Sequence, residues 1–153
     1  MADSQLETVR SRIVASVVAL DGWVESRRHF ALMVSDADDL QPRNVAVGFP
    51  RTDVTDQNTR RVTQRASSLG ALSETAILVR WVHRLQADGV PASYGEILEE
   101  ERDVLQAIST TDLVGLGTLV PRSIERTVRE DGLFHVTTVV YVLNHTYRFA
   151  VGS

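Results

Sequence analysis

Four histidines are the side chains of this sequence best suited to acid–base chemistry or to metal binding. Each lies on a segment with strand-like alternation or at the end of one, and no two have a metal-ligand spacing such as H-E-x-x-H. They are His29, His83, His135 and His145. The chain has no cysteine, which also removes thiolate ligands and cysteine nucleophiles. We therefore interpret the histidines as structural and predict neither a metal nor a cofactor.

Two further stretches partly match ligand-binding motifs. The acidic stretch SDADD at 35–39 is similar to the start of a calcium loop, but Gln41 stands where an EF-hand has glycine and Val47 where it has glutamate. The G-x-G in VGLGT at 114–118 lacks a third glycine and leads into a strand, so we predict a turn there. No P-loop, no G-x-S-x-G and no spaced carboxylate pair on adjacent strands occurs in the chain. The sequence predicts a protein that is not an enzyme.

The composition is typical of one globular domain, which we expect to span residues 1–153. With 43% hydrophobic and 24% charged residues, the chain is neither disordered nor fibrous. Its first residues lack the pattern of a signal peptide, and no run approaches the ~20 apolar residues of a membrane span. We therefore expect a protein made in the cytosol, with no membrane partner. The net charge of -4 argues against a protein that coats nucleic acid over its whole surface.

All 16 basic residues of the chain are arginines. A GC-rich genome explains this bias through its codon usage. Planar guanidinium groups also suit ion pairs across protein interfaces better than flexible ammonium groups do. The two explanations are compatible.

Apolar periodicity and turn residues divide the chain into two helices and four to five strands. Each helix begins with a predicted capping box, and the two boxes are Ser4 with Glu7 and Ser93 with Glu96. The predicted helices cover 4–20 and 93–108, and the predicted strands cover 29–36, 44–50, 74–85, 119–131 and 134–149. We expect the first two strands to form a hairpin and the third to be central. The order predicts an α+β fold, with a mixed, mainly antiparallel sheet and two helices packed on one face.

The segment 51–73 is polar and has no sustained apolar period. A segment of this length without regular structure is unusual inside a compact domain. We therefore predict a projecting polar arm or hairpin. Its small apolar surface does not offset the entropy of ordering, and we expect it to become ordered only in an assembly. Nucleic-acid binding is the alternative role, but the arm lacks interleaved aromatic residues, and Asp53 and Asp56 dilute its charge. Its candidate interface residues are Arg51, Arg60, Arg61 and Arg65.

Two further features indicate association with other chains. Glu101 falls within the apolar stripe of the second predicted helix, so we expect an arginine of the same chain or of a neighbour to pair with it. The closing strand spans roughly 50 Å when extended, whereas a domain of this size is only about 40 Å across. We therefore expect that strand to bend, or to reach past its domain and pair with another subunit. The interface candidates at its end are His145, Tyr147 and Phe149.

The order and character of these elements resemble the tail terminator proteins of long-tailed, siphophage-type bacteriophages, which are minor tail proteins that cap the tail tube. The resemblance covers nearly the whole chain. LETVRSRIVASVVALDGW is similar to the opening helix of the family, ETAILVRWVHRL to its central strand, SYGEILEEERDVLQAI to its second helix and SIERTVREDGLFHVTTVVYVLNHTYRF to its closing strand pair. No catalytic, metal or cofactor residue is carried over by the resemblance.

The resemblance implies a structural protein of the virion, assembled in the host cytoplasm as a homohexameric ring at the head-proximal end of the tail. Such a ring halts polymerisation of the tail tube protein and joins the tail to head-completion or neck proteins. Viral DNA passes through its lumen without specific binding. Two alternatives stay open: another phage neck protein, such as a head-completion or head–tail joining subunit, and a cellular module whose arm orders on RNA.

Overall fold

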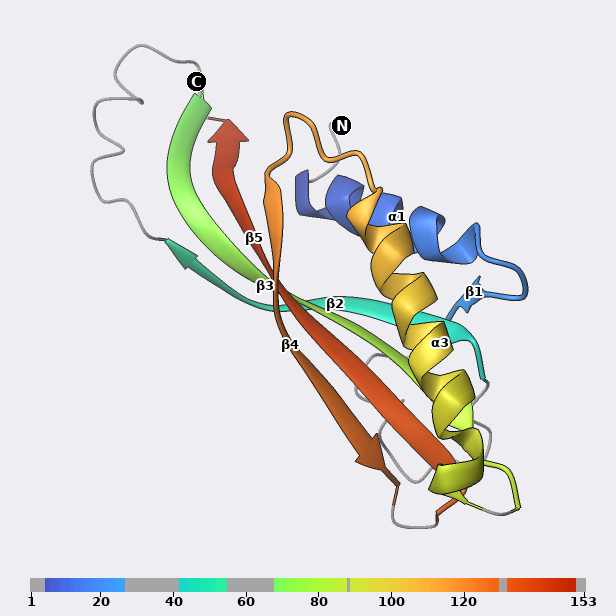
Figure 1. The fold of residues 1–153 in the computed structure, drawn as a ribbon. Helices are drawn as coiled ribbons and strands as arrows, with labels where there is room; N and C mark the ends of the chain where they lie inside the picture. Colours follow the sequence, from blue (N-terminus) through green and yellow to red (C-terminus); the bar gives the residue numbers. More distant parts are fainter. Residues whose placement is uncertain (1–4, 27–41, 55–67, 88, 130–131, 151–153) are drawn as a thin grey trace.

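The computed structural model describes residues 5–26, 42–54, 68–87, 89–129 and 132–150 (Figure 1). Within these ranges the chain forms two helices and five strands. Their order is α1 (Gln5–Val18), β1 (Val24–Glu25), β2 (Asn44–Val54), β3 (Ser68–Arg84), α3 (Val90–Ser109), β4 (Thr118–Val128) and β5 (Phe134–Ala150). The predicted strand at 29–36, with His29, and the predicted cap at Ser4 lie outside the described residues.

The five strands form one sheet in the order β1-β2-β3-β5-β4. The two-residue strand β1 runs parallel to β2, and the other three pairs of neighbouring strands are antiparallel. Both helices lie on the same face of the sheet, as Figure 1 shows. The predicted α+β fold, with its mixed, mainly antiparallel sheet and its two helices, is therefore confirmed.

Alternate residues of β3 build the main core beneath the helices. Ile77, Val79 and Trp81 are buried on the helix-covered face, as the two-residue alternation of this strand predicts. Trp81 also meets Trp23 edge-on, with 5.9 Å between the ring centroids. The helices contribute Val9, Ile13, Val17, Val104 and Ile108. Burial of these side chains fixes both helices on the sheet.

The opposite face of the sheet carries a smaller apolar cluster. Its members Ala46, Val82, Phe134 and Val136 are all buried. Strand β5 therefore has buried apolar residues on both faces, because Val139 belongs to the main core while Val136 faces the other way. This arrangement explains why the closing strand lacks a simple alternation of apolar and polar residues.

Strands β3 and β5 are each 17 residues long and pair with each other over their whole length. The ladder between β3 and β2 stops at Ser73, and the ladder between β5 and β4 stops at Asn144. Beyond these residues, segments 68–72 and 145–150 form a two-stranded extension, here called the ribbon, which continues past the helices (Figure 1). One edge of the end of the closing strand pairs with β3 of the same chain, and the expectation that this end pairs with another subunit stays a prediction for its other edge.

The predicted arm at 51–73 contains regular structure at both ends. Residues 51–54 belong to β2, and residues 68–73 extend β3 beyond the predicted start of the central strand at Glu74. Residues 51–54 pair with residues 73–76 of β3, and residues 68–72 pair with β5. The expectation that this segment is ordered only in an assembly is therefore wrong for these two ends, and the projecting arm or hairpin stays a prediction. Gly70 and Ala71 are weak strand formers, but pairing with β5 overrides their local preference. The remaining residues, 55–67, lie outside the described ranges.

Helix α3 begins earlier than the sequence predicts. Its first residue is Val90, preceded by Gly89 at the N-cap and followed by Pro91, whose fixed φ suits the first helical turn. Ser93 is buried inside the helix, where its hydroxyl accepts a hydrogen bond of 2.9 Å from the backbone N–H of Gln86. The predicted capping box of Ser93 with Glu96 is therefore wrong, because Ser93 ties the helix to the residues after β3 instead.

Candidate functional site: an apolar groove between α3 and β4

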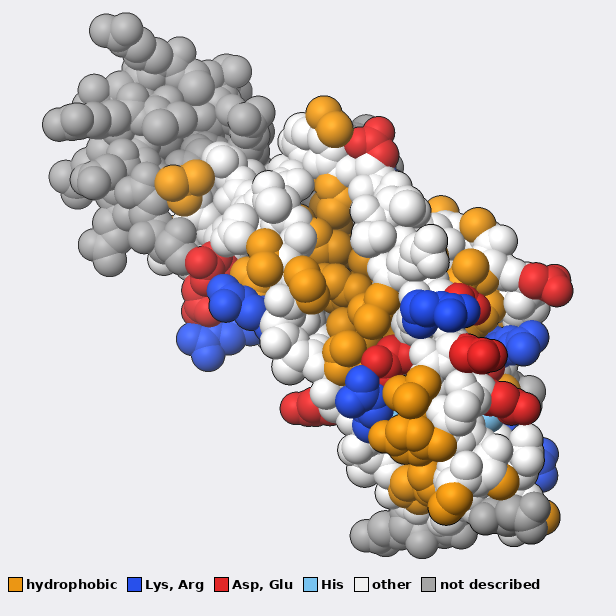
Figure 2. All heavy atoms as spheres, viewed as in Figure 1, with side chains coloured by type: hydrophobic (Ala, Val, Ile, Leu, Met, Phe, Trp, Pro, Cys, Tyr) orange, Lys and Arg blue, Asp and Glu red, His pale blue; other side chains and the backbone are white. Residues whose placement is uncertain are grey.

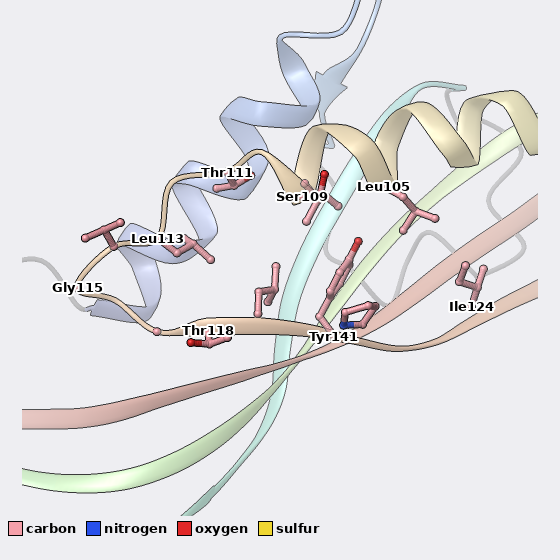
Figure 3. A pocket seen from close by; sticks show the side chains of 13 residues that line it. Leu105, Ser109, Thr111, Leu113, Gly115, Thr118, Ile124 and Tyr141 are labelled. Carbon is pink, nitrogen blue, oxygen red and sulfur yellow. The ribbon is translucent and has the colours of Figure 1, made fainter.

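An apolar groove of about 950 Å³ lies between the C-terminal half of α3, the loop at 111–117 and β4 (Figure 3). Figure 2 shows apolar side chains gathered along this hollow, between the helix and the edge of the sheet. Its walls are formed by Leu105, Ile108, Leu113, Leu119, Pro121 and Ile124. The groove exists because β4 is the edge strand beyond β5, and α3 leaves part of its helix-side face uncovered.

A bulge in β4 aims its apolar residues at the groove. Leu119 and Pro121 face it together because they are two residues apart. The register then shifts between Pro121 and Ser123, which brings Ile124 onto the same face although plain alternation would turn it away. Proline and a bulge are also typical of edge strands, where they limit pairing with other chains. The groove therefore combines an open strand edge with an apolar wall.

Gly117 fixes the end wall of the groove. Its φ is +148°, in the region that favours glycine, and a Cβ at this position would stand 2.6 Å from the backbone oxygen of Asn144. The amide nitrogen Nε2 of Gln5 donates a hydrogen bond of 3.1 Å to the carbonyl of Leu116, which ties the loop to α1. The predicted turn at 114–118 is confirmed, and it leads into β4.

Tyr141 of β5 forms the floor of the groove and points its hydroxyl into it (Figure 3). The residue is 5% exposed, and burial raises the pKa of its phenol to about 12. The hydroxyl is therefore neutral at physiological pH. A neutral hydroxyl on an apolar floor offers one oriented hydrogen bond to whatever occupies the groove, which is the usual design of a binding pocket.

An ion pair bridges α3 and β4 one helical turn from Leu105. Arg126 donates hydrogen bonds to both carboxylate oxygens of Glu101, at 2.7 Å from Nε and 2.6 Å from Nη2. Glu101 is 6% exposed, and the hydrogen bond to it raises the pKa of Arg126. The prediction that Glu101 pairs with an arginine is confirmed, and the arginine comes from the same chain. The buried carboxylate is thus satisfied within one subunit.

The opposite side of α3 is joined to the sheet by charged groups. Nδ1 of His83 lies 2.9 Å from Glu100, and Nε2 of the same ring lies 3.5 Å from Glu96. Arg43 also approaches Glu100, at 3.5 Å. The hydrogen bond to Glu100 raises the pKa of His83, whereas burial lowers the pKa of His135, which stands opposite it on β5. These charged contacts hold the helix on the sheet.

Arg51 is the described member of the four predicted arm arginines. It lies on the exposed end of β2 and pairs with Asp53 at 2.9 Å. An exposed pair of this kind contributes little to stability, so its exchange for a contact with another chain is inexpensive in free energy. The other three predicted arginines lie outside the described residues, and they are Arg60, Arg61 and Arg65.

The predicted interface residues of β5 lie at the base of the ribbon and along it. His145 is buried, and its Nε2 lies 2.6 Å from the hydroxyl of Thr75, which lies 2.8 Å from that of Thr52. Burial lowers the pKa of His145. In the single chain this residue therefore links three strands, and its place at a subunit interface stays a prediction. The backbones of Tyr147 and Phe149 continue the ladder with β3.

Within the described ranges, no group of three or more histidine, aspartate or glutamate side chains is arranged to hold a metal ion. No helix in the described part of the chain is long and apolar enough to cross a membrane. The chain matches no protein-family model and none of the curated proteins. The function is therefore inferred from the geometry of the chain itself.

The sequence places Leu105 and Ile108 on the apolar stripe of the second helix, but it does not predict the groove that they line. The signal for the groove lies in β4, where Leu119 and Ile124 are partly buried on a strand that is otherwise exposed. An edge strand with apolar residues on one face and no helix to cover them indicates an open apolar surface. The bulge that aligns these residues has no local pattern of its own in the sequence.

Proposed function

We propose that this protein is a tail terminator of a long-tailed bacteriophage, a structural subunit that forms a ring at the head-proximal end of the tail tube. One observation carries the proposal: the described residues form two different features at separate places in the fold. One is the groove beside the edge strand β4, and the other is the ribbon, whose backbone continues past both described helices. A closed ring built from identical subunits needs two such surfaces, because each subunit meets its two neighbours differently.

The order of the elements supports the same proposal. The chain has an opening helix, a long central strand, a second helix and a closing strand pair, in the order for which its sequence resembles tail terminators. In this role a hexameric ring stacks on the last ring of tube protein and stops its growth, and the other side of the ring receives head-completion or neck proteins. A net charge of -4 suits a conduit for DNA, because retained phosphate contacts oppose its passage.

The proposal is tested by the assembly of the purified chain with and without tail tube protein encoded beside its gene. Native mass spectrometry and negative-stain microscopy should find closed hexameric rings. These rings should cap one end of growing tubes and shorten them relative to tubes grown alone. A chain that stays monomeric up to its solubility limit and leaves tube length unchanged contradicts the proposal.

The same samples separate the two alternatives. Rings that leave tube growth unchanged but bind DNA-filled heads indicate another neck protein. A monomer that binds RNA tightly, with an affinity that falls steeply as salt rises, indicates the cellular module. Either result replaces the tail terminator proposal.

A further inference from the structure

The two ends of α3 rest on different parts of the sheet. The C-terminal part, residues 102–109, contributes Val104 and Ile108 to the main core, and α1 packs beside it (Figure 1). The N-terminal part, residues 90–101, has no member in that core among the described residues. Two of its three buried side chains are polar, so apolar burial holds this part less firmly. The three are Ser93, Ile97 and Glu101.

A row of polar and ionisable side chains lies on the sheet beneath the N-terminal part. His83 on β3 stands directly opposite His135 on β5 in the ladder, so both side chains share the face that α3 covers. Arg126 on β4 is opposite Thr137, two residues further along β5, and continues the row on the same face. His135 and Thr137 are 2% and 1% exposed. The helix therefore closes over a titratable ring that is shielded from water.

Ion pairs connect two members of this row to α3. Nδ1 of His83 lies 2.9 Å from Glu100, and Arg126 donates hydrogen bonds to both carboxylate oxygens of Glu101. These pairs attach the N-terminal part of the helix through charges, whereas the C-terminal part is attached through apolar side chains. The charged groups that face the row from neighbouring elements are Glu96, Glu100 and Glu101 on α3 and Arg43 before β2.

His135 is the ionisable member of the row that has no ion-pair partner among the described residues. Its Nδ1 lies 3.4 Å from the hydroxyl of Thr137. Burial lowers the pKa of His135, and the positive charges of His83 and Arg126 lower it further, whereas the negative charge of Glu101 raises it. The neutral ring is therefore accommodated beneath the helix. A proton on the ring adds a buried charge, whose cost falls only where water or a carboxylate can approach it.

The N-terminal part of α3 is the element that can admit water to His135 at the lowest cost. Strand β5 is paired at His135 with β3 on one edge and with β4 on the other, so its movement breaks two ladders. Movement of residues 90–101 separates the two ion pairs, the packing of Ile97 and the hydrogen bond from Gln86 to Ser93. Proteins open locally where few buried apolar contacts hold a segment. Opening therefore starts at this end of the helix.

We infer that His135 is a proton-operated switch, whose protonation releases residues 90–101 from the sheet while the strands and the C-terminal part of α3 stay packed. The inference goes beyond the proposed function, because it concerns one folded subunit and holds with or without a ring. The open form binds the proton more readily than the closed form does. The closed form is therefore most stable above the ordinary histidine pKa of about 6.5, and it loses this advantage as the pH falls.

His83 sets the pH at which the switch operates. Its hydrogen bond to Glu100 raises the pKa of His83, so this residue is protonated before His135 as the pH falls. The protonated ring strengthens the contact with Glu100 and places a positive charge opposite His135. Both effects oppose release of the helix. Release therefore needs a lower pH than an isolated histidine would give.

Hydrogen exchange of the full chain, followed by mass spectrometry, tests the switch. The protection of amides at 97–101 is compared with that at 104–108, at about pH 7.5 and about pH 5, after correction for intrinsic exchange rates. Wild type should lose about tenfold or more of its protection at 97–101 on acidification, and less than about threefold at 104–108. Unchanged protection at 97–101 overturns the inference, and so does an equal loss in both segments.

The variant His135→Gln removes the titrating ring and keeps a neutral side chain that can form hydrogen bonds. Its protection at 97–101 should stay within about twofold between the two pH values. The matched control is His145→Gln, which replaces another buried histidine whose pKa is also lowered by burial. This control should show the wild-type loss at 97–101. A wild-type loss in His135→Gln contradicts the inference, as does full protection of His145→Gln at the lower pH.

The variant His83→Gln gives a second measurement, which decides the question even if His135→Gln does not fold. It removes the positive charge that opposes a proton on His135 and also the contact with Glu100. The midpoint of the loss of protection at 97–101 should therefore move to higher pH, by about half a unit to one unit. Thermal unfolding at neutral pH establishes that the variant is folded. A midpoint that stays in place or moves to lower pH overturns the inference.

Discussion

The two sides of α3 are attached to the sheet in different ways. On the side toward β2 and β3, the charged contact between His83 and Glu100 holds the helix on the sheet. Ile97 on the inner face of the helix is 1% exposed. Toward β4, the groove stays open and Leu98 is 40% exposed. The closed side therefore supports the stability of the subunit, whereas the open side keeps apolar surface available at little cost to folding. Exposed apolar surface of this kind typically marks a binding site.

The sharpest test of this contrast uses two neighbouring residues of α3. Ile97→Ala should lower the free energy of unfolding by about 2–5 kcal/mol, because it leaves a cavity under the helix. Leu98→Ala should lower it by less than about 1 kcal/mol, because half-exposed side chains lose little on truncation. Urea unfolding measures both changes in the free energy of unfolding, provided that its dependence on urea concentration has the same slope in the variants and in wild type. Similar losses for the two variants would show that the side toward β4 is closed as well.

Gly117 tests the wall of the open side. Gly117→Ala should destabilise the subunit by about 1–3 kcal/mol, because its Cβ meets the Asn144 oxygen at 2.6 Å and its φ is +148°. The matched control is Gly95→Ala on α3, where no atom lies within 4 Å of the new Cβ. That variant should instead stabilise the subunit by about 0.5–1 kcal/mol through helix propensity. If both substitutions changed the free energy of unfolding in the same direction, the result would contradict the packing of the 111–117 loop on β5.

The ion pair at the boundary of the open side gives an intermediate effect. Arg126→Met should cost about 1–3 kcal/mol, because it leaves the Glu101 carboxylate buried without its donor. The side chain of Arg126 is 35% exposed, so the loss stays below that of a fully buried pair. Combining it with Glu101→Leu should restore most of the stability, since no buried charge is then left. A double-mutant cycle measures the coupling energy between Arg126 and Glu101. If the two single losses of stability simply added in the double variant, the ion pair would not couple the two residues.

Local sequence patterns predict much of this fold. The alternation of β3 and the periodicity of both helices identify the elements and their buried faces, and Glu101 within an apolar stripe predicts its arginine partner. These features depend on neighbours a few residues apart, which sequence periodicity records directly. The fold class follows from their order.

Features that depend on distant parts of the chain are predicted less well. The start of β3 at Ser68 is set by its pairing with β5, about 80 residues away in the sequence, and not by the strand preference of its own residues. The start of α3 is set by Pro91 and by the contact between Ser93 and Gln86. The groove needs the bulge of β4 and the close approach of Gly117 to β5. No pattern within one segment encodes these contacts.

The smallest expected effect concerns the closed side and its dependence on pH. The hydrogen bond to Glu100 raises the pKa of His83 above its unfolded value of about 6.5. Its contribution to stability is therefore fully present below that value and is lost as the pH rises through the folded pKa. His83→Gln should thus lower the unfolding midpoint at about pH 5.5 and change it little at about pH 8.5. The loss should stay below about 1 kcal/mol, because the ring and its acidic partners are partly exposed.

The neighbours of His83 make this pH profile specific. Glu96 and Glu100 contact its ring from α3, Arg43 lies near it just before β2, and His135 is its neighbour on β5. Burial lowers the pKa of His135, so its own contribution is present above about pH 6.5 and is lost as the pH falls. His135→Gln should therefore reduce the loss of stability that wild type shows on acidification, opposite in sign to the effect of His83→Gln.

Ring formation by His83→Gln should match wild type at about pH 8.5, because the contacts of His83 lie on the side of α3 away from the groove. If His83→Gln lost the same stability at both pH values, protonation of His83 would not contribute to the closed side. If the variant formed no rings at the higher pH, the proposed difference between the two sides of α3 would be wrong.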